Sequence, residues 1–381
     1  MISKEEIRRI KEVIAPYNMP MLSVYVNVDP SEPENGNKAY LIRAKNALKD
    51  LDVPDKLSKK IFDSLEYKTP QLKTRAIFVS QDIFESFDFQ VDLPIIDLRH
   101  GNIEAYFGEP YVTPLTLAID EYERYGVTLL SKERWRFFEV YMGEIIEVQD
   151  VFLAINMVDW RKVSEARPAS TIGIAGRGGT GRDKFDRRLL MWVSRFYKNA
   201  ANLLEKTVQD RNIDRLLIMG PSEDTAYFES FVSKSIQKKI MAHTSSLPNM
   251  DASSREVLYN IKGTIIEIEY QQEMALLNQV REKGLWGFEV SLIALQEGRF
   301  HLLAISWRPD NKVYVCKKTN LVFSNFELAK KSCEGGIVNV ELKDVVVDLA
   351  AMHGTRLKFL QGTPQKRLLS EFGGMAGLTR W

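Results

Sequence analysis

The sequence predicts an α/β protein with three domains. Short apolar strands alternate with amphipathic helices along the chain, and 381 residues exceed what one compact core usually contains. The longest apolar runs, such as 127–130 and 302–305, have the length of strands and fall far short of a membrane span. We therefore expect domains at residues 1–113, 114–271 and 272–381, and no membrane partner.

The N-terminal α/β domain is expected to begin with a helix over Lys4–Ile14, where apolar residues recur at helical spacing. Alternating apolar residues predict a strand over Met21–Val28, and turn residues predict a polar loop over Pro30–Asn37. A helix over Tyr40–Leu51 and a buried strand over Arg75–Ser80 follow in the same domain.

The middle domain is expected to hold a mixed sheet and a mobile Gly-rich loop. A helix over Pro114–Arg124 leads into a strand over Val127–Ser131. The strand Arg134–Tyr141 is expected to pair with Glu144–Asp150, because the tight turn Met142-Gly143 separates them.

A long helix follows the Gly-rich loop, from Asp186 to about Val208, with one apolar stripe. A buried strand is expected over Leu216–Met219, and further helices begin at Asp224 and Ser253. The stripe of the long helix consists of Leu189, Leu190, Val193, Phe196, Ala200, Leu203 and Leu204.

The C-terminal domain is expected to be a small α/β/α sandwich, because the order helix, glycine, strand recurs in it. The helix Gly287–Gln296 ends at Gly298 and leads into the strand Phe300–Ser306. The helix Leu342–His353 also ends at a glycine and leads into the strand Arg356–Leu360.

The two cysteines, Cys316 and Cys333, are too few for a disulfide scaffold and are typical of a reducing compartment. No apolar signal region follows Met1, so we expect a soluble, cytoplasmic protein. The two cysteines cannot complete a tetrahedral metal site alone, and His301 and His353 are interpreted as structural residues. We therefore expect no metal and no cofactor.

One segment of a nearly neutral protein is both basic and rich in glycine. The net charge is +1, yet residues 161–198 hold ten Lys and Arg against three acids, and five glycines lie within 173–181. A local contact with a polyanion has this charge distribution. A solvated, flexible loop has it equally often.

Three interpretations of the Gly-rich segment stay open. Gly176 and Gly181 have the spacing of a nucleotide-binding P-loop, but Arg182 and Asp183 stand where Lys and Ser or Thr belong. A linker without a special role also fits the composition. In the third interpretation the glycines let the backbone approach an RNA-rich surface while the arginines contact phosphates.

The third interpretation gains support from a resemblance. The run Gly176–Phe185 and the basic residues after it resemble the Gly-Arg-Gly-Gly-Gln signature of class-1 release factors of archaea and eukaryotes. The hairpin 125–145 and the strand 216–221 resemble that family's middle domain. In the C-terminal domain, Phe288–Gly298 resembles the opening helix and Phe372–Trp381 the Phe-Gly-Gly ending. The chain is therefore similar to divergent, bacterial-type members of the release factor and Pelota superfamily.

The resemblance implies a function on the ribosome, by peptidyl-tRNA ester hydrolysis in rescue or quality control. The implied partners are rRNA, peptidyl-tRNA and a translational GTPase, with no cofactor. Gly178, Gly179 and Thr180 are expected to approach the ester. The residues expected to contact RNA phosphates are Arg177, Arg182, Lys184, Arg187 and Arg188.

Thr180 departs from the family, in which glutamine helps water to attack the ester. The reaction needs a positioned water and stabilisation of the oxyanion rather than a strong base. Thr180 keeps the backbone N–H and offers a hydroxyl but lacks the reach of the amide, so hydrolysis stays undecided. The family's stop-codon motifs are not found in the first domain. A non-catalytic, Pelota-like factor and a protein-binding adaptor are therefore the alternatives.

Two further groups of residues are interpreted as structural. Trp192, Phe196 and Tyr197 could stack on RNA bases, but their helical spacing is typical of a core. His100 and His243 stand in turn-like segments without a nucleophile pattern, so we expect them at the surface.

Overall fold

The computed structural model divides the chain into two compact units. The first unit comprises residues 1–122 and 269–381, and the second comprises residues 123–268. The structure describes residues 20–49, 51–66, 72–98, 103–148, 153–154, 181–245, 247 and 250–380, without the side chains of 120, 153–154 and 181–189.

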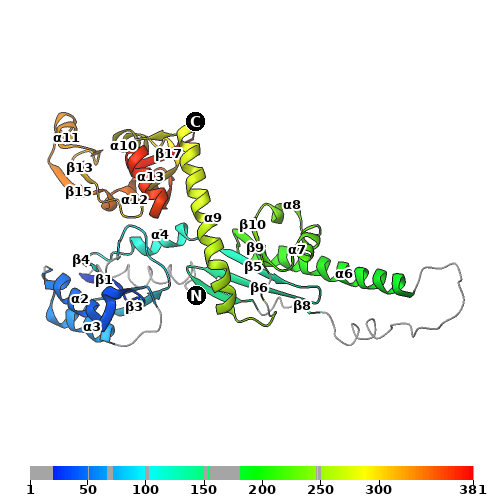
Figure 1. Cartoon of the computed structure of the whole chain (residues 1–381). Coiled ribbons are helices and arrows are strands. Elements are labelled where there is room, and N and C mark those ends of the chain that lie inside the picture. Colours follow the sequence, from blue (N-terminus) through cyan, green and yellow to red (C-terminus); the bar gives the residue numbers. More distant parts are fainter. Residues whose placement is uncertain are drawn as a thin grey trace, which may run out of the picture. The chain divides into compact units, whose positions relative to one another are not determined.

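The predicted α/β class is confirmed, because helices accompany the sheets in both units (Figure 1). The three domain boundaries stay a prediction. Helix α9 (Ser254–Lys283) continues without a break through the expected boundary at 271–272. Over the described residues no helix has the length and the apolar character that a membrane crossing requires.

The N-terminal part of the first unit holds an antiparallel sheet of order β3-β2-β1-β4. The central strands β1 and β2 are buried along their whole length. Helices α2 and α3 pack on the face formed by Leu22, Val24 and Val26, which alternate along β1. The elements are β1 (Met21–Asn27), α2 (Ala39–Lys49), α3 (Asp55–Glu66), β2 (Thr74–Val79), β3 (Phe84–Phe89) and β4 (Ile103–Gly108).

The strand at 21–28, the helix at 40–51 and the strand at 75–80 are thus confirmed within two residues. The polar loop predicted over Pro30–Asn37 is corrected, because its second half forms a 3-10 helix, η1 (Pro33–Lys38). Asn35 is buried there and donates to the Asn27 side chain at 2.9 Å, which gives the polar segment a fixed place. The helix predicted over Lys4–Ile14 lies outside the described residues.

The C-terminal part of the first unit holds a second sheet of order β11-β17-β12-β16. The central strand β12 runs parallel to β16 and antiparallel to β17. The predicted helix at 342–353 is interrupted at Val345, so a 3-10 turn, η4, precedes α12. The elements are β11 (Leu285–Trp286), α10 (Phe288–Gln296), β12 (Phe300–Ser306), η4 (Leu342–Asp344), α12 (Val346–Met352), β16 (Arg356–Leu360), α13 (Gly362–Phe372) and β17 (Met375–Thr379).

The glycines near the end of the chain have different structural roles. Gly373 ends α13 in the left-handed conformation with φ 66°, and Gly374 has φ 88°. Gly377 lies in β17, where a Cβ atom would come within 2.6 Å of the Phe300 ring. The glycine pattern of this ending therefore serves the packing of the C-terminal sheet.

A small three-stranded sheet of order β14-β13-β15 follows β12. Its strands are β13 (Lys312–Cys316), β14 (Val322–Phe323) and β15 (Ile337–Glu341), and it carries the short helix α11 (Phe326–Ser332). Cys316 and Cys333 are joined here in a disulfide bond. This corrects the interpretation of the two cysteines as thiols of a reducing compartment, because the fold brings the end of β13 to the end of α11.

Residues from the N-terminal half complete the C-terminal core of the first unit. Ile95 and Leu117 pack into the cluster formed by β12 and α10, and Leu117 belongs to α4 (Thr113–Glu121). Ile95 has φ 63°, which a β-branched residue rarely adopts. The carboxylate of Glu121 pairs with Lys358 of β16. Residues 95–121 and the C-terminal sheet are therefore packed together.

The second unit is built on a mixed sheet of order β10-β9-β5-β6-β7, with the short β8 beside β6. Strands β5, β9 and β10 are parallel, and β5, β6 and β7 are antiparallel. The predicted turn at Met142-Gly143 is confirmed, and both residues have positive φ. The strands are β5 (Tyr125–Leu130), β6 (Arg134–Tyr141), β7 (Glu144–Glu147), β8 (Leu153–Ala154), β9 (Arg215–Met219) and β10 (Ile240–Thr244).

Helices cover both faces of this sheet. On one face Phe137 and Ile218 pack against α6 (Gly181–Asp210), α7 (Ser222–Glu229) and α8 (Lys234–Gln237). On the other face Phe138 and Leu217 pack against the first half of α9. The alternation of side chains along each strand assigns neighbouring residues to opposite cores.

Candidate nucleic-acid interface

Helix α6 is the element that links the Gly-rich segment to the sheet of the second unit. It begins at Gly181, five residues before the predicted start at Asp186. The predicted catalytic residues Gly178, Gly179 and Thr180, together with Arg177, lie outside the described residues. Arg182, Lys184, Arg187 and Arg188 lie in the first turns of α6, and only their backbone is described.

One face of α6 is buried in the core of the second unit. Val193, Phe196, Ala200 and Leu204 are buried at helical spacing, as the predicted stripe requires. The prediction that Leu190 belongs to the buried stripe is wrong, because its side chain is 61% exposed. Tyr197, which lies on the same side of the helix, is fully buried.

The aromatic residues of α6 are core residues, as expected. Phe196 and Tyr197 are both buried, and Trp192 packs at the edge of the same cluster. The Tyr197 ring lies 5.8 Å from the Phe228 ring in an edge-to-face contact. Burial raises the pKa of the Tyr197 hydroxyl, and the nearby carboxylate of Asp224 adds to this effect. The rings of Phe196 and Tyr197 are therefore not available for stacking on bases.

The opposite face of α6 is exposed and carries positive charge. Arg195, Lys198 and Lys206 are exposed, and none forms an ion pair with a residue that the structure describes. They recur at intervals of three and eight residues, which places them along one side of the helix. From Lys198 to Lys206 the helix rises by about 12 Å. We call Arg195, Lys198 and Lys206 the cationic stripe.

A buried ion network fixes the C-terminal end of α6 to the sheet. Glu139 of β6 is 2% exposed and binds Arg211, the residue after α6, at 3.0 Å. The same carboxylate pairs with Arg124, whose guanidinium lies 4.1 Å above the Tyr141 ring. Because both arginines depend on one buried carboxylate, its loss would leave them without their partner. The network and the core hold α6 with its cationic stripe outward.

A pocket of about 500 Å³ lies where β5 and β9 end and α7 begins. In an α/β sheet this position often binds ligands. Its charged lining consists of Glu133, Glu223, Asp224 and Lys132, and Lys132 lies 3.8 Å from Asp224. Three acids and one paired lysine do not suit a phosphate, so the cationic stripe is the better candidate for contact with nucleic acid.

The histidines do not form a catalytic site among the described residues. His243 lies in strand β10, which corrects its assignment to a turn, and its Nε2 is 3.1 Å from Glu229. It is 42% exposed, as a surface residue should be. His301 contacts the Thr379 carbonyl through Nδ1 at 3.2 Å, in agreement with a structural role. His100 lies outside the described residues.

A comparison of the chain with protein families finds a match in the part of the chain that contains α6. Residues 110–262 match the model of bacterial archaeo-eukaryotic release factor family 10. This range contains the mixed sheet, the Gly-rich segment and all of α6. No curated protein sequence matches the chain significantly.

Solved structures of three related kinds align with the chain. An archaeal translation termination factor, aRF1, is 14% identical over 100% of this chain and 99% of that chain, with a TM-score of 0.25. Dom34 of S. cerevisiae, a translation termination-like factor, is 9% identical over 81% and 80%, with a TM-score of 0.41. An archaeal Pelota in a ribosome-bound model with ABCE1 is 11% identical over 100% and 94%, with a TM-score of 0.39.

Scores this low do not establish a common arrangement of the whole chain, so the match over residues 110–262 carries the assignment. Its matched range includes the segment in which the Gly-rich signature was found, between β8 and α6. Residues 110–262, less than half of the chain, are thus similar to bacterial archaeo-eukaryotic release factor family 10.

Proposed function

We propose that the chain is a cytoplasmic, ribosome-associated translation factor that acts in ribosome rescue or quality control. The observation that carries this proposal is the cationic stripe on α6, the helix that begins at Gly181, the last glycine of the Gly-rich sequence. Exposed cations without a partner in the described chain are suited to the phosphates of rRNA and tRNA. The basic residues Arg177, Arg182, Lys184, Arg187 and Arg188 extend this contact toward the loop.

The proposed reaction is hydrolysis of the peptidyl-tRNA ester at residues 178–180. Water attacks the ester carbonyl, the 3′ oxygen of the tRNA leaves with a proton, and the peptide is released as a carboxylic acid. Gly178 and Gly179 would allow close approach of the backbone. Thr180 would hold the water through its hydroxyl while its backbone N–H stabilises the developing oxyanion.

A translational GTPase is the proposed partner, and the domains 1–113, 114–271 and 272–381 are the proposed functional parts. Support comes from Dom34, which is described as interacting with Hbs1 in RNA quality control pathways. The archaeal Pelota is described as ribosome-bound together with ABCE1. Both relatives therefore work in assemblies.

The second candidate function is non-catalytic occupation of the ribosomal A site in the manner of Pelota. Thr180 in place of glutamine favours this alternative, because a threonine hydroxyl reaches less far than a glutamine amide. The basic residues would then position the chain on the ribosome without chemistry at the ester.

Release of labelled peptide from purified ribosomes that carry peptidyl-tRNA distinguishes the two candidates. We expect release by the wild-type chain and at least a tenfold slower rate for Gly179→Ala, because an added methyl group blocks close approach. Thr180→Gln should accelerate release if the loop reaches the ester. Salt-sensitive ribosome binding without any release supports the A-site role instead. If the chain neither binds ribosomes nor releases peptide, both functions are contradicted. The protein-binding adaptor is then the remaining alternative.

A further inference from the structure

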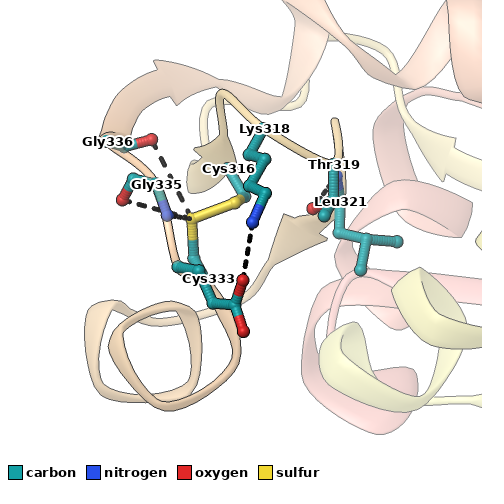
Figure 2. The surroundings of a disulfide bond; sticks show 8 residues. Cys316, Lys318, Thr319, Leu321, Cys333, Gly335 and Gly336 are labelled. Carbon is teal, nitrogen blue, oxygen red and sulfur yellow. Dashed lines mark hydrogen bonds and ion pairs between the residues drawn. A yellow bond between two sulfur atoms is a disulfide. The ribbon is translucent and has the colours of Figure 1, made fainter.

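The disulfide bond joins two cysteines that differ in burial. Cys316 is the last residue of β13 and is fully buried, whereas Cys333 follows α11 and is half-buried. The bond spans a sequence separation of 17 residues and closes a loop that contains β14 and α11. Figure 2 shows the bond between the end of β13 and the end of α11, with Lys318 beside it.

Apart from this bond, α11 is attached weakly to the small sheet. The helix has seven residues, which is too short to be stable alone. Ala329 is its one fully buried side chain. The Phe326 ring meets the Tyr314 ring at 5.7 Å but remains 47% exposed. The side chain of Asn325 caps the first turn by accepting from the Leu328 amide at 2.9 Å. The bond is therefore a principal constraint on the end of the helix.

The segment after Cys333 lies against the residues after Cys316. The Lys317 amide donates to the Gly336 carbonyl at 2.9 Å. At Gly335 a Cβ atom would come within 3.0 Å of the Lys318 side chain, so a larger residue would push the two segments apart. The disulfide lies at the point where these segments meet.

The Gly335 amide donates to the Cys333 sulfur at 3.4 Å, a contact that favours a thiolate over a thiol once the bond is reduced. The closed loop and its flanks, residues 317–334, contain four lysines and two glutamates. Lys330 and Lys331 precede Cys333 by two or three residues and are exposed. Positive charge beside a partly exposed cysteine lowers the free energy of the thiolate, which is the form that takes part in disulfide exchange.

We propose that the Cys316–Cys333 bond is a thiol-responsive clasp that fastens α11 to β13 when oxidised and releases it when reduced. A dithiol reductant attacks the accessible sulfur of Cys333, and Cys316 leaves as a thiolate that takes up a proton. The second thiol of the reductant then displaces Cys333. Two electrons and two protons pass to the protein, which gains two thiols, and the reductant becomes a disulfide.

For a protein of the cytoplasm, a disulfide bond with a reversible function is expected rather than one with a purely structural function. This step rests on the proposed ribosomal function, which places the chain in the cytoplasm. Disulfides that persist there in mesophiles are usually transient and redox-sensing, because glutathione and thioredoxin keep accessible thiols reduced. A half-buried cysteine whose sulfur accepts from the Gly335 amide meets the requirements of such a sensor.

Amide hydrogen exchange on the full-length protein tests the clasp, with oxidised and reduced dithiothreitol as the two conditions. Peptide mapping without reductant should recover residues 316 and 333 in one linked species. On reduction in native buffer we expect exchange in residues 326–336 to accelerate by up to about 200-fold, the effect that closing a loop of this length has in the chain-entropy model. Exchange in β12 and β16 should not change.

Two variants keep the test specific. Cys333→Ser should show the rapid exchange of the reduced protein under both conditions, whereas Ser332→Ala, one residue away, should respond like the wild type. Failure to find the linked species, equal exchange in both conditions, or reduction only after denaturant is added would each overturn the proposal. None of these measurements uses ribosomes, so their outcome is independent of peptide release.

Discussion

Helices α6 and α9 have the same length of 30 residues but use their charged residues differently. Helix α6 carries seven Lys and Arg against four acids, whereas α9 carries four against five. Near the end of α9, Arg281 pairs with Glu371 of α13, and in the same half Glu273 lies beside Lys358. The cations of the cationic stripe in α6 have no such partners among the described residues, and neither do the exposed Arg255 and Lys262 of α9. The surplus of basic over acidic residues in α6, rather than helix length or the lack of partners, therefore indicates the external surface for a polyanion.

The largest difference between the helices should appear when one tyrosine is removed from each. Tyr197→Ala in α6 deletes a fully buried ring and should lower the free energy of unfolding by about 4 kcal/mol. Tyr259→Ala in α9 removes a ring that is 83% exposed and should change it by no more than about 0.5 kcal/mol. Urea denaturation measures both variants, and similar losses would contradict the assignment of buried and exposed faces.

The ion network at the end of α6 should matter more than the ion pair at the end of α9. Glu139→Ala leaves Arg124 and Arg211 without their buried carboxylate and should lower the free energy of unfolding by about 3 kcal/mol. Glu371→Ala removes a carboxylate that is 42% exposed and pairs with both Arg281 and Arg367, so solvent screening should keep the loss well below that of Glu139→Ala. A strong effect of both substitutions would show that the two pairs are equivalent.

Glu273 makes the second half of α9 sensitive to pH. Burial raises the pKa of its carboxyl to about 7, with Lys358 opposing this effect and Glu121 and Glu269 adding to it. Because the folded-state pKa lies above the unfolded value, the folded protein holds the proton more tightly, and this contribution to stability is lost as pH rises from about 4.5 to about 7.

The contribution should amount to about 2 kcal/mol, since the side chain is only partly buried. The pH dependence of unfolding for the wild type and Glu273→Gln measures it. Glu273→Gln should be more stable than the wild type at pH 8, relative to pH 4, because an amide does not ionise. Parallel pH profiles would show that Glu273 titrates normally. The substitution should leave the second unit unaffected, which exchange in β5 and β9 can verify.

Substitution of the cationic stripe should have the smallest effect on stability and the clearest effect on ribosome binding. The triple variant Arg195→Gln, Lys198→Gln and Lys206→Gln should unfold like the wild type, because all three side chains are exposed. Its affinity for ribosomes should fall by at least about tenfold, with a shallower dependence on salt. Sedimentation with ribosomes at several salt concentrations measures both quantities.

A matched control comes from the same unit. Lys238→Gln, Arg255→Gln and Lys262→Gln remove three exposed charges, one after α8 and two on α9, which covers the face of the sheet opposite α6. The control variant should bind ribosomes like the wild type. Equal weakening of both triple variants would mean that net charge, and not the stripe, determines binding.

Local sequence patterns predicted most of the regular elements. The strands at 21–28, 75–80 and 300–306 were evident from apolar alternation or runs, and glycines marked the ends of α10 and α12 correctly. The α6 helix was also predicted, although its start was placed five residues late. The Gly-rich signature was visible in the same way, since composition and spacing are properties of neighbouring residues. The structural state of Gly178, Gly179 and Thr180 stays a prediction.

Other features depended on contacts between residues far apart in the chain. Sequence spacing did not reveal that Cys316 and Cys333 would be joined, because the bond requires β13 and α11 to end side by side. Leu190 fitted the apolar stripe of α6 but is 61% exposed and lies outside the core that Val193 and Phe196 enter. His243 entered a strand because β9 offered a parallel neighbour. The sequence alone thus determined the helices, strands and turns, which depend on local periodicity, whereas only the tertiary structure decided which side chains are buried, paired or left exposed, because those depend on distant packing partners.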